Sequence, residues 1–466
     1  MIMPMMMIRT GVSPAKTQSF RAGLWFCGAL LLFGIAGFSP ARAESEKETL
    51  TKEFYSKGIE YYRAQDIPQH YDEAFVWISK AAEYDHPRAQ AILADMYHNG
   101  LGTQINEQKS LELTKAAAEQ GDTFGQFLLG KALYLGLGAK QDRDNGTKIL
   151  SHVFNALEEE ANSGDVHAQS SLAWIYYHLS DANNDYQKAH FWYEKAAVQG
   201  YAVAQNALGL LFERGDGVRE NSQAKMVWYR RAASQGAPIG QYNLAMALGE
   251  QRDFDGQFTW VRRSADLHYA EAQYFLGWIY EVGEGGTRDL HEALLWYRKA
   301  ADQDHVLAQY KLGEFYHYGS GVSQDYEEAR KWYEMAAKNG DADAMANLGH
   351  FFEKGFGVEK DYATARDWYT QGADQHHSPS QARLGFLYLY GYGVKKDLGK
   401  AREWLERAAG GGNESAYYGI GLIHEEKGRY SQAIRWYLLS AIKGYGFGFK
   451  RAVFLMVLYP VISMRA

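Results

Sequence analysis

Cysteine and proline are scarce in this chain of 466 residues, and both shortages limit what it can be. The single cysteine, Cys27, rules out a fold held together by internal disulfides. Only 8 prolines stand beside 48 glycines, which indicates regular breaks between elements rather than stiff linkers. Because the chain has only one long apolar run, a polytopic membrane protein is excluded as well.

The long apolar run lies near the N-terminus, from Leu24 to Phe38, after a stretch with basic residues and no acid. It is too short to span a bilayer comfortably, and Ala41-Arg42-Ala43 follows it. This order is typical of a secretory signal peptide. We therefore expect segment 1–43 to be cleaved after Ala43, and the mature chain to be periplasmic or secreted. An uncleaved anchor and a start methionine further downstream are the alternatives.

Cleavage would change both the charge and the chemistry of the chain. Segment 1–43 holds four of the 49 basic residues and none of the 56 acidic ones, so the mature chain has a net charge of −11. A basic surface for nucleic acid is therefore not expected. The segment also holds the only cysteine, so the mature chain has neither a disulfide nor a thiol nucleophile.

Tryptophan, in contrast, is abundant and regularly spaced. Eight of the twelve recur at steps of 36 or 32 residues, at positions 192, 228, 260, 296, 332, 368, 404 and 436. Trp77 joins this register if Leu113 and Ala156 fill the two positions between. A small pair such as Ala336-Ala337 stands four residues after the tryptophan and alanine often stands three before it, all on one helix face. We predict that these nine tryptophans are buried wedges between helices.

Another helical pattern precedes each helix that carries one of these tryptophans. It reads Ala-Gln-x-x-Leu-Gly-x-x-Tyr, for example at 272–280 and 308–316. Glycine inside a helix costs about 1 kcal/mol relative to alanine, so Gly277 and Gly313 indicate close contact with another backbone. A Gly-x-Gly-Val turn follows, as at 319–322, and then an aspartate N-cap with glutamate three residues on, such as Asp325 and Glu328. Two units, 237–268 and 413–444, are four residues shorter, and we assign their length change to this turn.

These patterns together resemble the Sel1-like repeat, a relative of the tetratricopeptide repeat, over about residues 50 to 444. The resemblance implies an all-α fold, a right-handed superhelical solenoid of about ten to eleven antiparallel helix pairs with a concave binding surface. We divide the chain into a signal peptide at 1–43, a first capping repeat at 44–85, the repeat array at 86–444 and an apolar capping segment at 445–466. Departures are local: unit 165–200 replaces the turn, and unit 122–164 has an insertion and no tryptophan.

The position just after the Leu-Gly pair varies too much between repeats to be a shared core position. In the related repeats the first helix of each pair lines the groove, so we expect this position, and the tyrosines one turn before it, to contact a partner. Local repacking is the alternative. The candidate partner-binding residues are Trp174, Trp278, Tyr242, Tyr274, Tyr310, Glu314, His350 and Phe386.

Catalytic, metal and cofactor sites are not predicted. The Gly-x-Gly turns recur in unit after unit and lack the Lys-Ser/Thr of a phosphate-binding loop. The histidines are scattered and form no His-Glu-x-x-His motif. Some cysteine-rich relatives are associated with β-lactam binding, but the one Ser-x-x-Lys motif, at 13–16, lies in the segment expected to be removed. An enzyme would carry a polar cluster that breaks the repeat, for which the irregular stretch 136–185 is the best place.

The sequence therefore predicts a non-catalytic module that binds a protein or peptide partner in the groove of a solenoid. No cofactor, no nucleic acid and no transmembrane span in the mature chain are expected. A structural scaffold in an envelope-associated complex, for envelope or exopolysaccharide assembly or regulation, is the alternative, and a hydrolase is less favoured. The apolar segment after Tyr445 is expected to cap the array or to dock on another protein.

Overall fold

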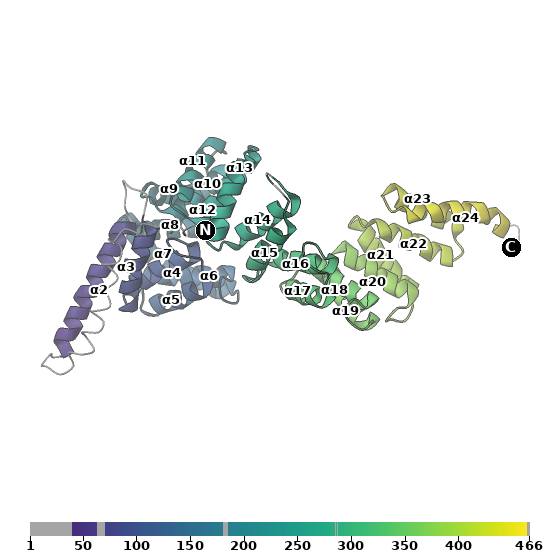
Figure 1. Cartoon of the computed structure of the whole chain (residues 1–466), viewed down its shortest axis with the longest axis horizontal. Coiled ribbons are helices and arrows are strands. Elements are labelled where there is room, and N and C mark those ends of the chain that lie inside the picture. The colour runs from purple at the N-terminus through teal and green to yellow at the C-terminus, as the bar shows by residue number, and fades with distance from the viewer. Residues whose placement is uncertain (1–39, 63–69, 180–184, 285, 287, 464–466) are drawn as a thin grey trace, which may run out of the picture.

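The structure is a computed structural model, and it describes residues 40–62, 70–179, 185–284, 286 and 288–463. Helices and short connections make up this part of the chain, and it contains no strand. Consecutive helices pack as antiparallel pairs, and the pairs stack into a superhelix. Helices α3 to α13 gather in one compact part, from which α2 projects on one side and α14 to α24 extend on the other (Figure 1). The predicted all-α solenoid is confirmed.

Each pair consists of a first helix and a second helix, most of them 13 residues long. The first helices are α2 (Pro40–Tyr62), α4 (Pro87–Asn99), α6 (Thr123–Leu135), α8 (Val166–His178), α10 (Ala202–Arg214), α12 (Pro238–Glu250), α14 (Ala270–Val282), α16 (Val306–Tyr318), α18 (Ala342–Lys354), α20 (Ser378–Tyr390) and α22 (Glu414–Glu426). The second helices are α3 (Tyr71–Glu83), α5 (Glu107–Glu119), α7 (Arg143–Asn162), α9 (Asp185–Val198), α11 (Ser222–Ser234), α13 (Phe254–Asp266), α15 (Leu290–Ala301), α17 (Tyr326–Lys338), α19 (Tyr362–Asp374), α21 (Leu398–Gly410) and α23 (Tyr430–Ile442). A last helix, α24 (Phe447–Ser463), follows.

The predicted caps fix where the helices begin and end. Asp325 accepts hydrogen bonds from the backbone N–H groups of Glu327 and Glu328 at 3.0 Å, which caps the N-terminus of α17. First helices such as α16 end at a left-handed glycine, Gly319, which a residue with a Cβ would adopt only at a cost. The second glycine of the turn, Gly321, lies against the backbone of Leu290 at the start of α15. Each full turn therefore packs on the second helix of the preceding repeat.

Among the large side chains of a second helix, the residue just after the tryptophan is deeply buried, and it is usually a tyrosine. Tyr297, Tyr333 and Tyr369 are fully buried. Each ring lies against the helical glycine of its own first helix, and a Cβ added to Gly313 would meet the Tyr333 ring at 2.5 Å. The close approach that the glycines predicted is therefore glycine to ring rather than backbone to backbone.

The tryptophans themselves are less buried than predicted. Trp192, Trp296 and Trp332 are buried, and the other six in the register are half-buried. The indole N–H of Trp332 donates to Glu328 at 3.2 Å, and the Arg298 guanidinium lies over its ring. The indole N–H of Trp296 donates to Glu292 in the same way, so both of these rings place their N–H beside a carboxylate while the rest of the ring is buried.

Buried glutamines connect each repeat to the next. The Gln273 side chain donates to the carbonyl of Ala265 at the end of the preceding second helix, at 3.1 Å. Its own carbonyl accepts from Gln303 at 2.7 Å, and the Gln205–Gln235 pair repeats this contact at 2.6 Å. The Ala-Gln pair of the sequence motif therefore satisfies carbonyl groups at helix ends that would otherwise be left without partners.

The insertion in the third repeat lies elsewhere than predicted. Gly130 of α6 faces Leu150 of α7, the same contact that Gly313 makes with Tyr333. The tryptophan position of α7 is therefore Ile149 and not Ala156, and the extra residues follow it. They extend α7 to 20 residues, and because seven residues make about two turns, the buried stripe stays on one face through Ala161.

The two short units keep both helices, as predicted. In the pairs α12–α13 and α22–α23 the connection shrinks to residues 251–253 and 427–429. The altered turn of unit 165–200 at 180–184 lies outside the described residues, as does most of the predicted signal peptide. Helix α2 begins at Pro40, so the predicted cleavage position lies in its first turn. Within the described ranges, no helix is long and apolar enough to cross a membrane.

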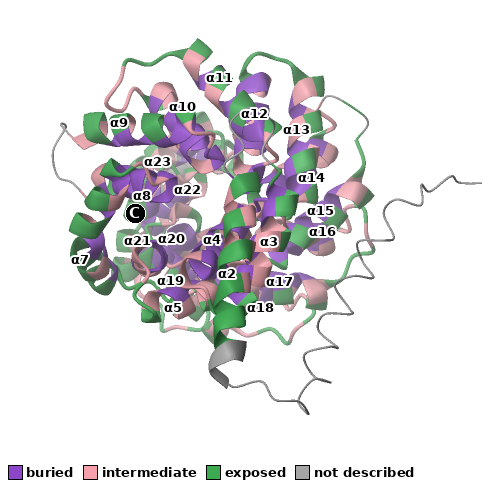
Figure 2. Cartoon of the chain, turned by 90° about the vertical axis from the view of Figure 1, so that its left-hand side faces the viewer, coloured by how far each residue is buried: buried purple, intermediate pink, exposed green. Residues whose placement is uncertain are grey.

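Neighbouring first helices pack on one another, as α4 does on α6 and α18 on α20, which places them on the inner side of the superhelix. Seen end-on, helices α9 to α18 run around the outside of the view, and α2, with many exposed residues, lies in front of the middle (Figure 2). Gly100, at the end of α4, touches Pro238, at the start of α12. The superhelix therefore returns on itself within its N-terminal half.

Candidate functional site

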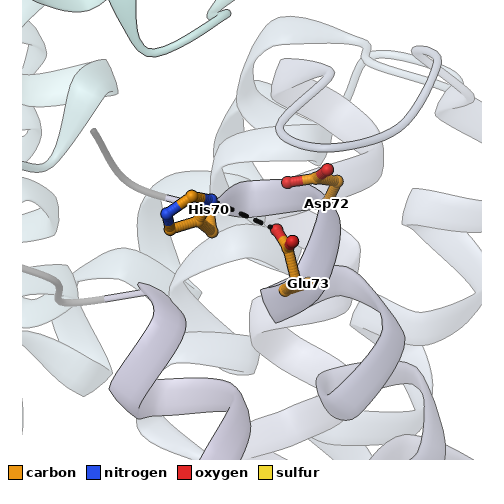
Figure 3. A group of neighbouring side chains, drawn as sticks. All are labelled: His70, Asp72 and Glu73. Carbon is orange, nitrogen blue, oxygen red and sulfur yellow. Dashed lines mark ion pairs between the residues drawn. The ribbon is translucent and has the colours of Figure 1, made fainter. Parts of the chain in front are cut away.

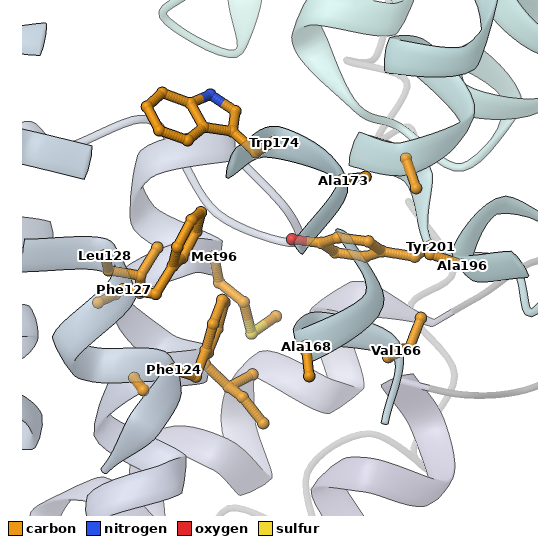
Figure 4. Close-up of a cluster of buried hydrophobic side chains, with 14 of the residues drawn as sticks. Met96, Phe124, Phe127, Leu128, Val166, Ala168, Ala173, Trp174, Ala196 and Tyr201 are labelled. Atoms are coloured by element: carbon orange, nitrogen blue, oxygen red, sulfur yellow. The ribbon is translucent and has the colours of Figure 1, made fainter. Parts of the chain in front are cut away.

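The inner side of the N-terminal half is filled by side chains. Tyr62 of α2, Tyr71 of α3, His167 of α8 and Tyr201 before α10 pack ring against ring, with all four buried. Figure 4 shows Tyr201 pointing into the same space as Met96, Phe124 and Phe127 of the neighbouring repeats. A partner segment therefore has no groove to enter here.

A buried carboxylate stands in this filled interior. The Tyr201 hydroxyl donates to Asp95 at 2.7 Å, and the Asn99 amide donates to the other carboxylate oxygen at 2.8 Å. Burial raises the pKa of Asp95, and the Tyr201 hydrogen bond and the charge of Lys131 oppose this shift. Burial in turn lowers the pKa of Lys131, and the nearby Asp95 and Glu107 oppose that shift. Asp95 occupies the variable position of its repeat, so in that repeat the position is interior.

Trp174 belongs to the same interior. It is only 8% exposed, and its ring lies edge-on to Phe127 and Tyr134 and stacks on His178. Exposure of Trp174 in a groove is therefore wrong, because rings of the adjacent first helix α6 and of its own helix cover it. The burial of Trp174 favours the alternative, local repacking.

From α12 onward the inner side is open, and the other candidates are half-buried. Trp278 of α14 stacks on Phe275 with ring centroids 5.2 Å apart, and Phe275 lies edge-on to Tyr242 of α12. Tyr274 stacks on His305 at 4.8 Å. Burial raises the pKa of Tyr242 to about 12, so it carries a neutral hydroxyl at physiological pH. These rings are fixed by their neighbours and still expose part of their surface.

The next repeat places polar groups beside the rings. The Tyr310 hydroxyl donates to Glu314 at 3.2 Å, and Asn347 of the following repeat donates to Tyr310 at 3.4 Å. Lys311 forms ion pairs with Glu314 at 3.1 Å and with Glu281 at 3.3 Å. Charges of both signs therefore alternate with tyrosines along this part of the inner side.

His350 and Phe386 continue the row at the same position of the next two repeats. Burial lowers the pKa of His350 and the charge of Arg383 adds to the shift, so the imidazole is neutral at pH 7. Phe386 stacks on Tyr390, whose ring lies 5.5 Å from that of Tyr392. Together these half-buried or exposed side chains form what we call the open inner surface: Tyr242, Tyr274, Trp278, Tyr310, Glu314, His350, Phe386 and Tyr390.

Sequence reasoning missed the exposed tyrosines at the C-terminal ends of the first helices. Tyr318 and Tyr390 are 65% and 49% exposed, and both follow the variable position by four residues. Helical spacing could have found them, because residues four apart share a face. Tyr392 lies between the two turn glycines and stacks on Tyr362, which extends this aromatic surface onto the turn.

A cleft of about 770 Å³ separates the two ends of the closed superhelical turn. Its walls come from residues 98–99, 105–108 and 137 on one side and from 239, 268–271 and 302–305 on the other. His98 bonds Glu107 at 2.9 Å on the first wall, and His305 pairs with Glu271 at 3.2 Å on the second. Each pair is complete within its own wall, so the cleft holds no set of converging free ligands.

One group of side chains has metal-ligand spacing. The ligand atoms of His70, Asp72 and Glu73 lie within 4.8 Å of one another at the start of α3 (Figure 3). All three are exposed, and His70 already pairs with Glu73 at 3.4 Å. Helix N-termini commonly gather acidic side chains without a metal, so we assign no metal or cofactor to this group.

Comparison with known proteins identifies the repeat. The family model described as Sel1 repeat matches ten segments, at 55–86, 87–122, 123–148, 166–201, 202–236, 270–305, 306–341, 342–377, 378–413 and 415–445. The chain is a Sel1 repeat protein. The short pair α12–α13 lies outside these matches but has the same two helices. Solenoids of this family are a known type of protein-interaction module and are generally non-catalytic.

Solved structures resemble this Sel1 protein over most of its length. The protective antigen c5321 of uropathogenic Escherichia coli, described as displaying an SLR fold, is 29% identical and has a TM-score of 0.57. The match covers 90% of this chain and 91% of that one. A Sel1 repeat protein of Oxalobacter formigenes is also 29% identical, covering 66% of this chain and 88% of its own, with a TM-score of 0.48.

A curated relative matches over a short stretch. An uncharacterised protein of Neisseria meningitidis serogroup B is 31% identical over 106 residues, which is 23% of this chain. The match spans about a fifth of that relative's length, 21%.

Proposed function

We propose that this Sel1 repeat protein is a non-catalytic module that binds a protein or peptide segment along the open inner surface, in the periplasm or outside the cell. The observation that carries the proposal is the row of partly exposed aromatic side chains on successive first helices. Tyrosine and tryptophan offer large contact area and lose little conformational entropy on binding, so they often dominate binding energy.

The surroundings of these rings support a protein partner. Tyr310, Glu314, Lys311 and Asn347 present hydroxyl, carboxylate, ammonium and amide groups beside the rings, which suits the mixed chemistry of a peptide. The helices hold these groups in place before binding, which reduces the entropy lost on association. The N-terminal half, with its filled interior, would act as a rigid support and not as a binding surface.

The export proposal rests on the composition of segment 1–43. A basic start, an apolar core and a small-residue end are what the secretory pathway recognises. N-terminal sequencing of the exported protein would test it, and we expect the mature chain to begin at Glu44. A mature chain that still begins at the first methionine would contradict cleavage.

The binding proposal is tested by crosslinked pull-down with the mature chain. We expect Trp278→Ala combined with Tyr310→Ala to reduce partner recovery at least tenfold. Phe191→Ala is the matched control, because Phe191 is an exposed aromatic residue on a second helix and lies outside the open inner surface. Equal recovery from all three proteins, with unchanged circular dichroism, would overturn the proposed surface. Turnover of a generic hydrolase substrate would overturn the non-catalytic proposal.

A scaffold in an envelope-associated assembly is the second candidate. The exposed apolar surface of α24 favours it, because a patch of this kind at the end of a solenoid is suited to assembly. A scaffold predicts several partners distributed along the array. Pull-downs would then recover a set of proteins, of which only a part would depend on Trp278 and Tyr310.

A further inference from the structure

Helix α24 occupies the place of a first helix in a further repeat. It follows α23 through a short connection, and its residues Ala452 and Leu455 are buried in a cluster with Tyr437 and Ala433. The guanidinium of Arg451 forms an ion pair with Glu425 of α22, which fixes the helix against the preceding repeat. The helix is therefore part of the stack and not a loose tail.

The face of α24 that points away from the array has no cover. In the repeats before it, a second helix of the same repeat packs on the first helix. No described helix follows α24, and a row of large apolar side chains is exposed along it. These residues are Phe447, Phe449, Val453, Phe454, Met456 and Val457, and Ile442 at the end of α23 lies exposed as well.

The composition of α24 favours a protein over a membrane as the cover. The helix carries apolar residues on all sides, and its described charged residues, Lys450 and Arg451, lie near its start. A helix that lies on a membrane surface needs a strongly polar face, and Arg451 is already paired with Glu425. A helix that is apolar on all sides is typically buried between protein elements.

The exposed area matches one side of a stable dimer. Seven apolar side chains that are about half exposed or more offer on the order of 700 Å² when a whole aromatic side chain counts about 200 Å². A standard interface buries about 800 Å² on each partner. Lys450 is exposed on the same face, with its ammonium over the Phe447 ring, and the rest of the patch is apolar. An apolar patch can be complementary to itself, which a two-fold interface requires.

We propose that a second copy of this chain covers α24, so that two solenoids pair end to end through their C-terminal helices about a two-fold axis. Each α24 takes, for the other copy, the place that a second helix takes elsewhere in the array. The dimer joins two open inner surfaces in one particle.

Sedimentation equilibrium of the purified mature chain tests the mass. We expect twice the chain mass for the wild type at micromolar concentration, and the single-chain mass for Val457→Glu. Val198→Glu is the matched control, because Val198 is similarly exposed on α9 and should leave the dimer intact. A monomeric wild type, or a Val457→Glu protein that stays dimeric, would overturn the proposal.

A disulfide test locates the interface. The mature chain has no cysteine of its own, so Val453→Cys introduces a single thiol. Under mild oxidation we expect a covalent dimer from Val453→Cys at a yield at least tenfold above that from Val198→Cys. Equal yields would overturn the arrangement, as would a monomer that co-sediments with phospholipid vesicles through Phe454, the result expected of a membrane-binding helix.

Discussion

At the scale of single residues, the fold depends on rings that lie against glycines. A glycine on the first helix leaves room for the residue that follows the tryptophan, so the two helices of a pair approach closely at that point. The tryptophan beside it covers the outer edge of the same interface. The spacing of the tryptophans predicted the repeat, but the side chain at the centre of the contact is the next residue along the chain. Tyr, Ile, Leu and Val all occur at that position, so its pattern is weaker in the sequence.

Gly313→Ala is expected to destabilise the protein, although alanine favours helix by about 1 kcal/mol over glycine. The new Cβ would lie 2.5 Å from the buried Tyr333 ring, and overpacking of this kind costs about 1 to 3 kcal/mol. Gly410→Ala in α21 is the control, since an added Cβ there meets nothing within 4 Å. Urea unfolding should show opposite signs for the two changes. A Gly313→Ala protein as stable as Gly410→Ala would contradict the contact.

Trp332→Ala should lower the free energy of unfolding by about 3 to 5 kcal/mol, because it removes a buried indole. Trp404→Ala should lower the free energy of unfolding by clearly less, because Trp404 is half-buried and part of its ring is already in water. Thermal unfolding of both purified variants measures the difference. Equal losses would mean that burial does not set the contribution of this position.

At the scale of elements, capping explains why helix boundaries could be predicted well from the sequence. An aspartate before a second helix and a glycine after a first helix are local chemical requirements, and each shows in the residues themselves. The insertion in α7 was misplaced because Leu113, Ile149 and Ala156 are all apolar and no tryptophan marks the register. The contact between Gly130 and Leu150 resolves that ambiguity only in three dimensions.

Asp325→Ala should destabilise the protein by about 1 kcal/mol, because two backbone N–H groups at the start of α17 lose their acceptor. Asp325→Asn retains an acceptor oxygen, so it should lower the free energy of unfolding by only about a few tenths of a kcal/mol. Chemical denaturation of the two variants checks the order. Identical midpoints for Asp325→Ala and wild type would show that the cap contributes nothing.

At the scale of the whole molecule, sequence reasoning reached its limit at the path of the superhelix. The repeat pattern describes contacts between neighbours, and it correctly predicted helix pairs with first helices on the inner side. It did not predict that Tyr201 would meet Asp95 at 2.7 Å, because that contact depends on curvature accumulated over several repeats. Trp174 and Trp278 show the same limit. They occupy equivalent positions in the repeat pattern, yet Trp174 is buried and Trp278 is half-buried.

Stability should fall as the pH drops below about 6.5, the ordinary histidine pKa. Burial lowers the pKa values of His178, His190, His317 and His350, so the folded protein holds these imidazoles neutral. The unfolded chain then binds more protons in this range, and protonation favours unfolding. Urea midpoints at about pH 7.5 and about pH 5.5 test this. A midpoint that rises on acidification would contradict the assigned protonation states.

The contact between Gly100 and Pro238 and the Tyr201–Asp95 hydrogen bond also bear on how the protein opens. In an ordinary solenoid each repeat touches only its neighbours, so unfolding spreads one unit at a time from either end. Here residues more than a hundred positions apart lock the first half into a ring, so α4 and α10 can lose their structure only together. Amide hydrogen exchange should therefore report one shared opening free energy for α4 to α10, and a graded series of lower values from α14 toward α22.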